Sequence, residues 1–276
     1  MMMERDSLQD LAGDSLAAMI SLVKEHTGIA MDERKGVLLQ GRLRPRIRAL
    51  GLAGYRAYID HVKKGAEVPA FISLVTTNDT AFFRTPVVWD YLAGDFLPAW
   101  LRDQGSQTLR IWSAAAATGE EAYSLAMLCV DFQQANPAFR FRIDATDISP
   151  DALAVAQAAR YQGRSVQRFE SDRPAQFARH MVADESSWAV RPDVTRHVRF
   201  ASHHLLRERS RSTYDLILLR NVLMYFTDDD QLRALTGVSA ALAPHGRLVL
   251  GEQDSLTRLA VPFRLVKPHV YELSGK

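Results

Sequence analysis

The chain has 276 residues, of which 47% are hydrophobic, and a net charge of +2 at pH 7. This composition supports a sizeable core and excludes a disordered tail. The single cysteine, Cys129, excludes a disulfide framework or a thiolate metal cluster within the chain, and its apolar surroundings predict a buried thiol.

The first part of the chain predicts helices only. Residues 1–16 carry acids where a secretion signal needs a cationic end, and no window of about 18 apolar residues predicts a membrane span. We therefore expect a cytoplasmic protein without a membrane anchor. Residues 6–65 have hydrophobic residues at helical spacing, kinked or interrupted at Pro45. The run RLRPRIR contributes Arg42, Arg44, Arg46 and Arg48 with no acid among them, which predicts a local basic patch.

The stretch TTNDTAFFR, residues 76–84, combines turn-forming residues with two aromatics. Thr, Asn and Asp favour caps and bends, whereas Phe82 and Phe83 favour burial in a core. The stretch therefore predicts a bend, either a structural joint or a surface that presents polar side chains to a ligand. A helical pattern over 86–103 follows it.

From residue 108 the pattern changes to strands alternating with helices. Such alternation predicts a parallel sheet covered by helices on both faces. Residues 165–197 break the rhythm and predict a short antiparallel insert, and 263–273 predict a closing hairpin. The strands are expected at 108–114, 141–148, 197–205, 214–222 and 246–253.

The segment IWSAAAATGEEAYSL, residues 111–125, has the order strand, small-residue loop, helix. Small side chains let the backbone approach a ligand, but the loop matches neither a dinucleotide nor a phosphate-loop motif. Glu120 and Glu121 would repel a pyrophosphate and attract a cationic amine; equally, they are ordinary residues for a helix start. From the loop alone, both interpretations stay open.

Two later positions favour the ligand interpretation. Asp147 ends the second strand, where doubly wound folds place an acid on ribose hydroxyls, and Ser149 is suited to cap the next helix. Arg220 and Asn221 follow an apolar strand directly, at the edge of the sheet where ligands bind. A nucleoside cofactor with a cationic part and no phosphate fits S-adenosylmethionine better than NAD or ATP.

At this point the chain resembles the bacterial chemotaxis receptor glutamate methyltransferases. The resemblance runs from about residue 15 to the end and rests on five blocks in the family's order: TTNDTAFFR, RIWSAAAATGEEAYSLAM, ATDISPDAL, YDLILLRNVLMYF and GRLVLGEQDSL. It implies an all-helical N-terminal domain followed by a Rossmann-like, class I S-adenosylmethionine-dependent methyltransferase domain with a small antiparallel β insert. The expected bounds are 1–75 for the helical domain, 76–106 for a linker and helix, 107–276 for the methyltransferase domain, and about 165–197 for the insert.

The resemblance also implies a set of functional residues. Arg84 and Tyr225 are expected to position the substrate, and Arg42, Arg44, Arg46 and Arg48 to dock on the receptor. The expected substrate is a glutamate on the cytoplasmic helical bundle of a chemoreceptor, modified to its methyl ester by a monomeric enzyme that needs no metal. The expected cofactor contacts are Asn78, Thr80, Arg84, Glu120, Asp147, His204, Leu205, Arg220 and Asn221.

Two other functions stay open from the sequence. A catalytically weak or inactive adaptor would bind the cofactor and dock on receptors without methyl transfer. A nucleic-acid methyltransferase would place the arginines on phosphates. The near-zero net charge and the absence of an Asn-Pro-Pro-aromatic or Asp-Pro-Pro-aromatic motif make this second function the weaker one.

Overall fold

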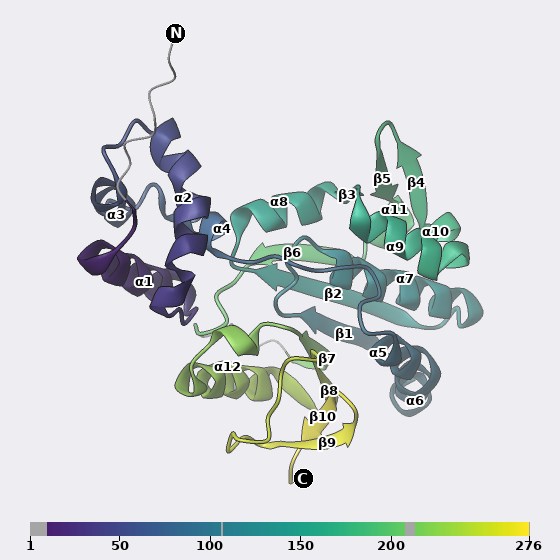
Figure 1. Ribbon diagram of the computed structural model, residues 1–276. Coiled ribbons are helices and arrows are strands. Elements are labelled where there is room, and N and C mark those ends of the chain that lie inside the picture. The colour runs from purple at the N-terminus through teal and green to yellow at the C-terminus, as the bar shows by residue number, and fades with distance from the viewer. Residues whose placement is uncertain (1–9, 106, 208–212, 276) are drawn as a thin grey trace. The chain divides into compact units, whose positions relative to one another are not determined.

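The computed structural model describes residues 10–105, 107–207 and 213–275 (Figure 1). These residues form two compact units. The first contains the chain up to Thr77 together with Tyr225–Thr227, and the second contains Asn78–Met224 and the chain from Asp228 onward. Of the residues predicted to be helical, 6–9 lie outside the described ones.

The first unit is built from helices. Helix α2 buries Leu39, Leu43 and Ile47, which are spaced four apart and therefore lie along one side of the helix. Pro45 lies inside this helix on its exposed side, and the helix runs through it without interruption. The helices of this unit are α1 (Gly13–Thr27), η1 (Glu33–Lys35), α2 (Gly36–Ala49), α3 (Tyr55–Lys63) and α4 (Val68–Val75).

A buried carboxylate joins three of these segments. Glu67 is only 5% exposed, and its two oxygens accept hydrogen bonds from Arg46 at 2.8 and 2.9 Å. The Tyr58 hydroxyl donates to the same carboxylate at 3.2 Å. Bidentate pairing of this kind satisfies a charge that burial would otherwise disfavour. Arg46 therefore contributes to the packing of the helical unit.

The second unit contains a seven-stranded sheet in the order β6-β2-β1-β7-β8-β10-β9. The strands from β6 to β8 are parallel, and β10 is antiparallel to both of its neighbours. This arrangement confirms the predicted mostly parallel sheet with a hairpin at its end. The strands are β1 (Thr108–Ser113), β2 (Arg140–Asp147), β6 (Val198–Ser202), β7 (Tyr214–Leu219), β8 (Leu242–Leu250), β9 (Phe263–Lys267) and β10 (Val270–Leu273).

Helices cover both faces of this sheet. Right-handed crossovers place α7 and α8, which follow β1 and β2, on the face opposite α12, which leads from β7 to β8, and Figure 1 shows α8 and α12 on opposite sides of the strands. Cys129 lies fully buried in α7, and burial raises the pKa of its thiol, as expected for a packing residue. The helices around the sheet are α5 (Pro86–Tyr91), the π-helical η2 (Leu92–Phe96), α6 (Leu97–Gln104), α7 (Glu120–Ala135), α8 (Pro150–Ala158) and α12 (Asp228–Ala241). The 3-10 turn η3 (Leu223–Tyr225) follows β7 in the chain.

The predicted insert contains helices as well as strands. Its antiparallel sheet has the order β3-β5-β4, and β3 lies before the predicted start at residue 165. Helix α9 buries Val166 and Phe169, three residues apart, and its other positions are largely polar; this polar surface is why the segment reads as irregular. The elements are β3 (Arg160–Tyr161), α9 (Arg164–Asp172), α10 (Pro174–His180), β4 (Met181–Asp184), β5 (Ser187–Val190) and α11 (Pro192–Thr195).

Asp131 fastens this insert to α7. Its carboxylate accepts hydrogen bonds from His180 at 2.9 Å, Arg179 at 2.6 Å and Gln176 at 3.1 Å, all from α10. Burial raises the pKa of Asp131, but these hydrogen bonds outweigh burial and lower the pKa to about 2.

We expect this contact to weaken in acid. The folded-state pKa lies below the ordinary value of 3.8, so the stabilisation is complete above pH 4 and is lost as the pH falls toward 2. The shift corresponds to about 2 kcal/mol of unfolding free energy. Urea unfolding between pH 5 and pH 2 should show a shallower loss of stability for Asp131→Asn than for the wild type. Equal slopes would contradict the prediction.

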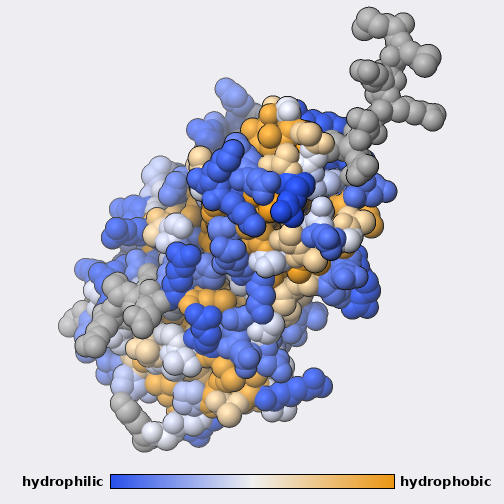
Figure 2. Space-filling model, turned by 90° about the vertical axis from the view of Figure 1, so that its left-hand side faces the viewer, coloured by the Kyte–Doolittle hydropathy of each residue, from blue (hydrophilic) through white to orange (hydrophobic). Residues whose placement is uncertain are grey.

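The hydrophobic side chains lie mainly in the two cores. Figure 2 shows a largely hydrophilic face with smaller hydrophobic groups between the polar ones. Val37 on α2 is the most exposed large hydrophobic side chain in the described ranges, at 82%. Among the described helices, none combines the length and the apolar character that crossing a bilayer requires.

Candidate functional site

The candidate site lies where β1, β2 and β7 end. These strands are neighbours and parallel, so the segments that follow them meet at one edge of the sheet. The loop after β1 is held there by its backbone: the Ala114 N–H donates to Leu218 O at 2.8 Å, and the Ala116 N–H to Thr146 O at 2.9 Å. The small-residue loop therefore lies between the ends of β7 and β2.

Gly119 ends this loop with φ of +96°, in the left-handed region that favours glycine. A Cβ here would lie 2.9 Å from both the Ala156 Cβ and the Tyr161 hydroxyl oxygen. We expect Gly119→Ala to lower the free energy of unfolding by about 1–3 kcal/mol. Gly237→Ala is the matched control, since nothing lies within 4 Å of a Cβ at this exposed position of α12. Equal unfolding midpoints for the two variants would contradict the prediction.

Asp147 connects the loop to the next helix. Its Oδ2 accepts the Ala117 N–H at 2.9 Å, and its Oδ1 accepts the Ser149 N–H at 2.9 Å. Ser149 in turn caps α8 through a hydrogen bond from the Ala152 N–H at 3.3 Å, which confirms the predicted cap. Burial raises the pKa of Asp147, and the backbone donors partly offset that effect.

Glu120 and Glu121 begin α7 but have different partners. Glu120 is buried, its Oε2 accepts the Thr118 hydroxyl at 2.6 Å, and burial raises its pKa. Glu121 accepts the Ser113 hydroxyl at 2.7 Å through Oε1, and Arg220 at 3.1 Å through Oε2. Arg220 neutralises Glu121, so Glu120 is the acid suited to receive a cationic amine.

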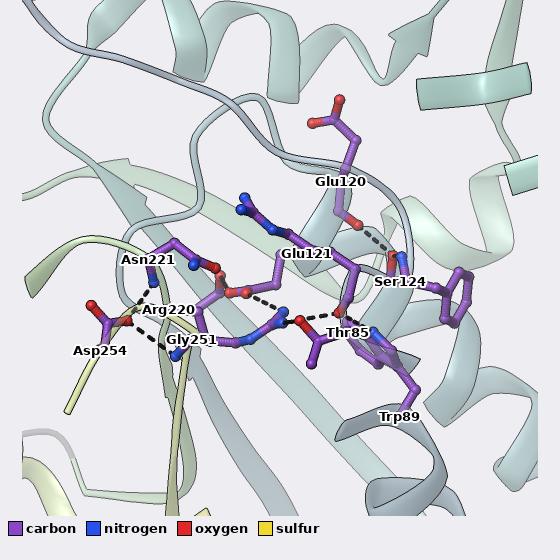
Figure 3. A network of polar contacts seen from close by, with 12 residues as sticks. Thr85, Trp89, Glu120, Glu121, Ser124, Arg220, Asn221, Gly251 and Asp254 are labelled. Atoms are coloured by element: carbon purple, nitrogen blue, oxygen red, sulfur yellow. Dashed lines mark hydrogen bonds and ion pairs between the residues drawn. The ribbon is translucent and has the colours of Figure 1, made fainter. Parts of the chain in front are cut away.

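The side chain of Arg220 lies inside the unit (Figure 3). It is 2% exposed, and its Nη2 donates to the Thr85 hydroxyl at 2.6 Å and to the Arg84 carbonyl at 2.9 Å. The Trp89 indole N–H donates to that same carbonyl at 2.8 Å. The guanidinium thus fastens the segment that follows TTNDTAFFR to the edge of the sheet, a role that the sequence alone did not reveal for Thr85 or Arg220.

The stretch TTNDTAFFR is anchored through its phenylalanines and its backbone. Phe82 and Phe83 are both buried against Phe169, with ring centroids 5.0 and 5.1 Å apart. The Phe83 N–H donates to the Ser124 hydroxyl at 2.9 Å, and this hydroxyl donates to the Glu120 carbonyl at 2.6 Å. The expected core role of the two phenylalanines is confirmed by their burial, and the stretch is tied to the start of α7.

The polar side chains of the stretch are less enclosed. Asn78, Thr80 and Arg84 are half-buried. The Arg84 Nη1 donates to the Asp79 carbonyl at 3.2 Å and lies 3.7 Å from the Asp79 carboxylate. Their contact with a cofactor stays a prediction.

His204 and Leu205 follow β6 and are also half-buried. The neighbouring His203 N–H donates to the Asp147 carbonyl at 3.0 Å, which places this segment beside the acid. His204 Nδ1 accepts the Leu206 N–H at 3.2 Å. Burial lowers the pKa of His204, and the charges of Arg207 and Arg233 lower it further.

The remaining predicted residues belong to the first unit. There the Tyr225 carbonyl accepts the Ala30 N–H at 2.8 Å. Arg42 donates to the Val75 and Thr76 carbonyls and to the Thr77 hydroxyl, Arg44 lies 3.3 Å from Asp10, and Arg46 pairs with Glu67. Arg48 is exposed. The docking role of these arginines stays a prediction.

The site suits a nucleoside that carries an amine. The two Asp147 oxygens accept the Ala117 and Ser149 N–H groups, and a carboxylate has about four lone-pair sites, so acceptor capacity remains for a hydroxyl. The amide Nδ2 of Asn221 is buried and has no partner among the described residues, so a donor is available to a ligand. No group of three or more His, Cys, Asp or Glu side chains suited to a metal ion is found in the described part of the chain.

Comparison with known proteins gives consistent matches. A family model described as "CheR methyltransferase, SAM binding domain" matches residues 78–271, and one described as "CheR methyltransferase, all-alpha domain" matches 14–76. A chemotaxis protein methyltransferase 1 of Pseudomonas aeruginosa is 30% identical over 247 residues, which cover 87% of this chain and 89% of that protein. A chemotaxis protein methyltransferase 1 of Vibrio cholerae is 31% identical over 252 residues, covering 89% and 90%. A chemotaxis protein methyltransferase of Escherichia coli is 31% identical over 262 residues, covering 92% and 88%.

Proposed function

The chain belongs to the CheR methyltransferase family, and from this premise we propose that it methylates glutamate side chains of a chemoreceptor. Family membership makes it an S-adenosylmethionine-dependent methyltransferase of chemotaxis. The proposal adds the acceptor, a glutamate carboxylate on the receptor's cytoplasmic helical bundle, the methyl ester as product, and the cytoplasm as the place of the reaction.

The observation that carries the proposal is the set of acceptors at the edge of the sheet. Asp147 is proposed to hold the ribose hydroxyls and Glu120 the amine of the cofactor, with the loop between them small enough for close approach. Asn78, Thr80, Arg84, His204, Leu205, Arg220 and Asn221 are the further proposed contacts. Arg220 would act mainly through its backbone, since its guanidinium is bound to Glu121 and Thr85.

Methyl transfer to a carboxylate requires little of the protein beyond orienting the two reactants. When bound, S-adenosylmethionine supplies an electrophilic methyl group on a sulfonium. A glutamate carboxylate is already ionised near neutral pH, so no residue of the chain has to act as a general base. The chain has to align the carboxylate with the methyl group and exclude water, and orientation of this kind lowers barriers substantially. Arg84 and Tyr225 are the residues proposed to position the carboxylate.

Docking is proposed to use α2. Positions 37, 41, 44 and 48 lie along one side of this helix, because they are spaced by three or four residues. On that side Val37, Gly41 and Arg48 are exposed. Arg42 and Arg46 lie on another side, where they bond within the helical unit. Arg44 is half-buried and lies 3.3 Å from Asp10, so of the four arginines the exposed Arg48 is best placed for an acidic receptor helix.

The test is methyl transfer to a purified receptor signalling fragment from labelled S-adenosylmethionine. We expect base-labile label on glutamates, located by peptide mass spectrometry and absent when those glutamates are replaced with alanine. Cofactor binding without any transfer would instead support the adaptor, and base-stable label on added nucleic acid would support the nucleic-acid enzyme. Either result would overturn the proposal.

A further inference from the structure

We propose that Asp254 is a positioning residue for cofactor binding, which acts by holding Asn221 in the conformation that presents its side-chain amide. This inference rests on the proposed function, because it takes Asn221 to contact the cofactor. Asp254 lies after β8 and Asn221 after β7, so the proposal concerns a link between the ends of two neighbouring strands.

The link includes two hydrogen bonds to one carboxylate oxygen, and the backbone of Leu223 and Met224 also interacts with this carboxylate. Asp254 is 9% exposed, and its Oδ2 accepts the Asn221 N–H at 2.6 Å and the Gly251 N–H at 3.1 Å (Figure 3). Without this oxygen, two backbone donors at the end of the strands would lose their acceptor. Buried donors without partners are costly, so the turn would rearrange to satisfy them.

The conformation that the link maintains is an unusual one. Asn221 has φ of +56°, in the left-handed region that only a few per cent of non-glycine residues adopt. The backbone directly after β8 also approaches closely: a Cβ at Gly251 would lie 2.5 Å from the Asn221 nitrogen and 2.7 Å from its Cγ. The turn is therefore confined by Gly251 and bound by Asp254.

The consequence is a side-chain amide in a defined place. The Asn221 Nδ2 is buried without a partner among the described residues. The preceding residue, Arg220, is bound to Thr85 and Glu121 (Figure 3). The two residues of the turn are thus anchored separately, and the Asn221 amide is the group left to meet a ligand. Burial also raises the pKa of Asp254, and the backbone donors partly offset that effect.

The test is calorimetric titration of the full chain with S-adenosylhomocysteine. Losing the two hydrogen bonds in Asp254→Ala should lower the affinity roughly tenfold or more. In Asp254→Asn the amide oxygen can replace Oδ2, so the affinity should return to within about threefold of the wild type. If Asp254→Asn binds as weakly as a folded Asp254→Ala, or if Asp254→Ala binds like the wild type, the proposal is wrong.

Asp215→Ala is the matched control. Asp215 lies at the other end of β7 and also accepts a backbone N–H, that of Arg110, at 2.8 Å. Its removal should lower stability and leave the affinity unchanged. An equal loss of affinity in Asp215→Ala would mean that general destabilisation explains the effect, which would overturn the positioning role.

A double-variant cycle separates positioning from direct contact. If Asp254 acts through Asn221, Asp254→Ala should have no further effect on affinity in an Asn221→Ala background. Additive losses would contradict the proposal. A wild-type chain that binds no S-adenosylhomocysteine would instead contradict the proposed function, so the two failures are distinguishable. Should Asp254→Ala not fold, Gly251→Ala displaces the same turn from the other side and is expected to lower the affinity as well.

Discussion

Asp147→Ala is expected to lower the affinity for S-adenosylhomocysteine by roughly a hundredfold, because charge-assisted hydrogen bonds each contribute about 1.5–3 kcal/mol. The proposed ribose contacts would lose their acceptor. At the same time the Ala117 and Ser149 N–H groups would lose theirs, which loosens the loop after β1 and the start of α8. Both effects act on the same ligand site. Calorimetry on wild type and variant measures the change.

The control for this experiment lies on the same strand. Asp144 accepts the Tyr214 hydroxyl at 2.7 Å and lies three residues before Asp147, away from the end of β2. Asp144→Ala should leave the affinity within about twofold of the wild type, since interactions without shared partners act independently. Wild-type affinity in Asp147→Ala, or the same loss in both variants, would refute the role proposed for Asp147.

Glu121→Ala is expected to give the largest loss of stability, about 3–5 kcal/mol of unfolding free energy. The Arg220 guanidinium would remain buried without its counter-ion, while its other hydrogen bonds go to neutral oxygens. Urea unfolding followed by tryptophan fluorescence measures the effect. All four tryptophans, Trp89, Trp100, Trp112 and Trp188, belong to the second unit, so the signal reports that unit alone.

A second replacement shows whether the loss comes from the unpaired charge. Combining Glu121→Met with Arg220→Met removes both charges and should recover part of the stability, because an apolar pair of similar volume has no buried ion to solvate. The exposed pair Arg168–Asp172, at 3.3 Å on α9, is the control, and Asp172→Ala should have no measurable effect. If the double variant is less stable than Glu121→Ala, the cause is lost packing.

Local patterns in the sequence were sufficient for the main features of the site. The alternation of strands and helices predicts the parallel sheet, and parallel strands bring Asp147 and the small-residue loop to one edge. Ser149 caps α8 through a hydrogen bond to a residue only three positions away. The cap depends on residues close in sequence, and the sheet depends on a periodicity that each element shows by itself.

The helices of the insert were harder to predict from the same patterns. Residues 165–197 are predominantly polar, and α9 offers only a narrow hydrophobic side to the core. The hydrophobic side of this helix has its partners elsewhere in the chain, because Phe169 packs on Phe82 and Phe83.

By itself, the sequence determined the two-part organisation, the sheet and the acids at its edge, because periodicity and strand direction are local properties. Only the tertiary structure decided what the charged side chains bind. Arg220 meets Glu121 across 99 positions, and Asp254 meets Asn221 across 33. Arg46 meets Glu67 across 21 positions, and Arg42 meets the Thr76 carbonyl across 34. A charged side chain pairs with the group that packing brings within hydrogen-bond distance. That packing joins segments that lie far apart in the sequence, so the local pattern of either segment does not reveal the pair.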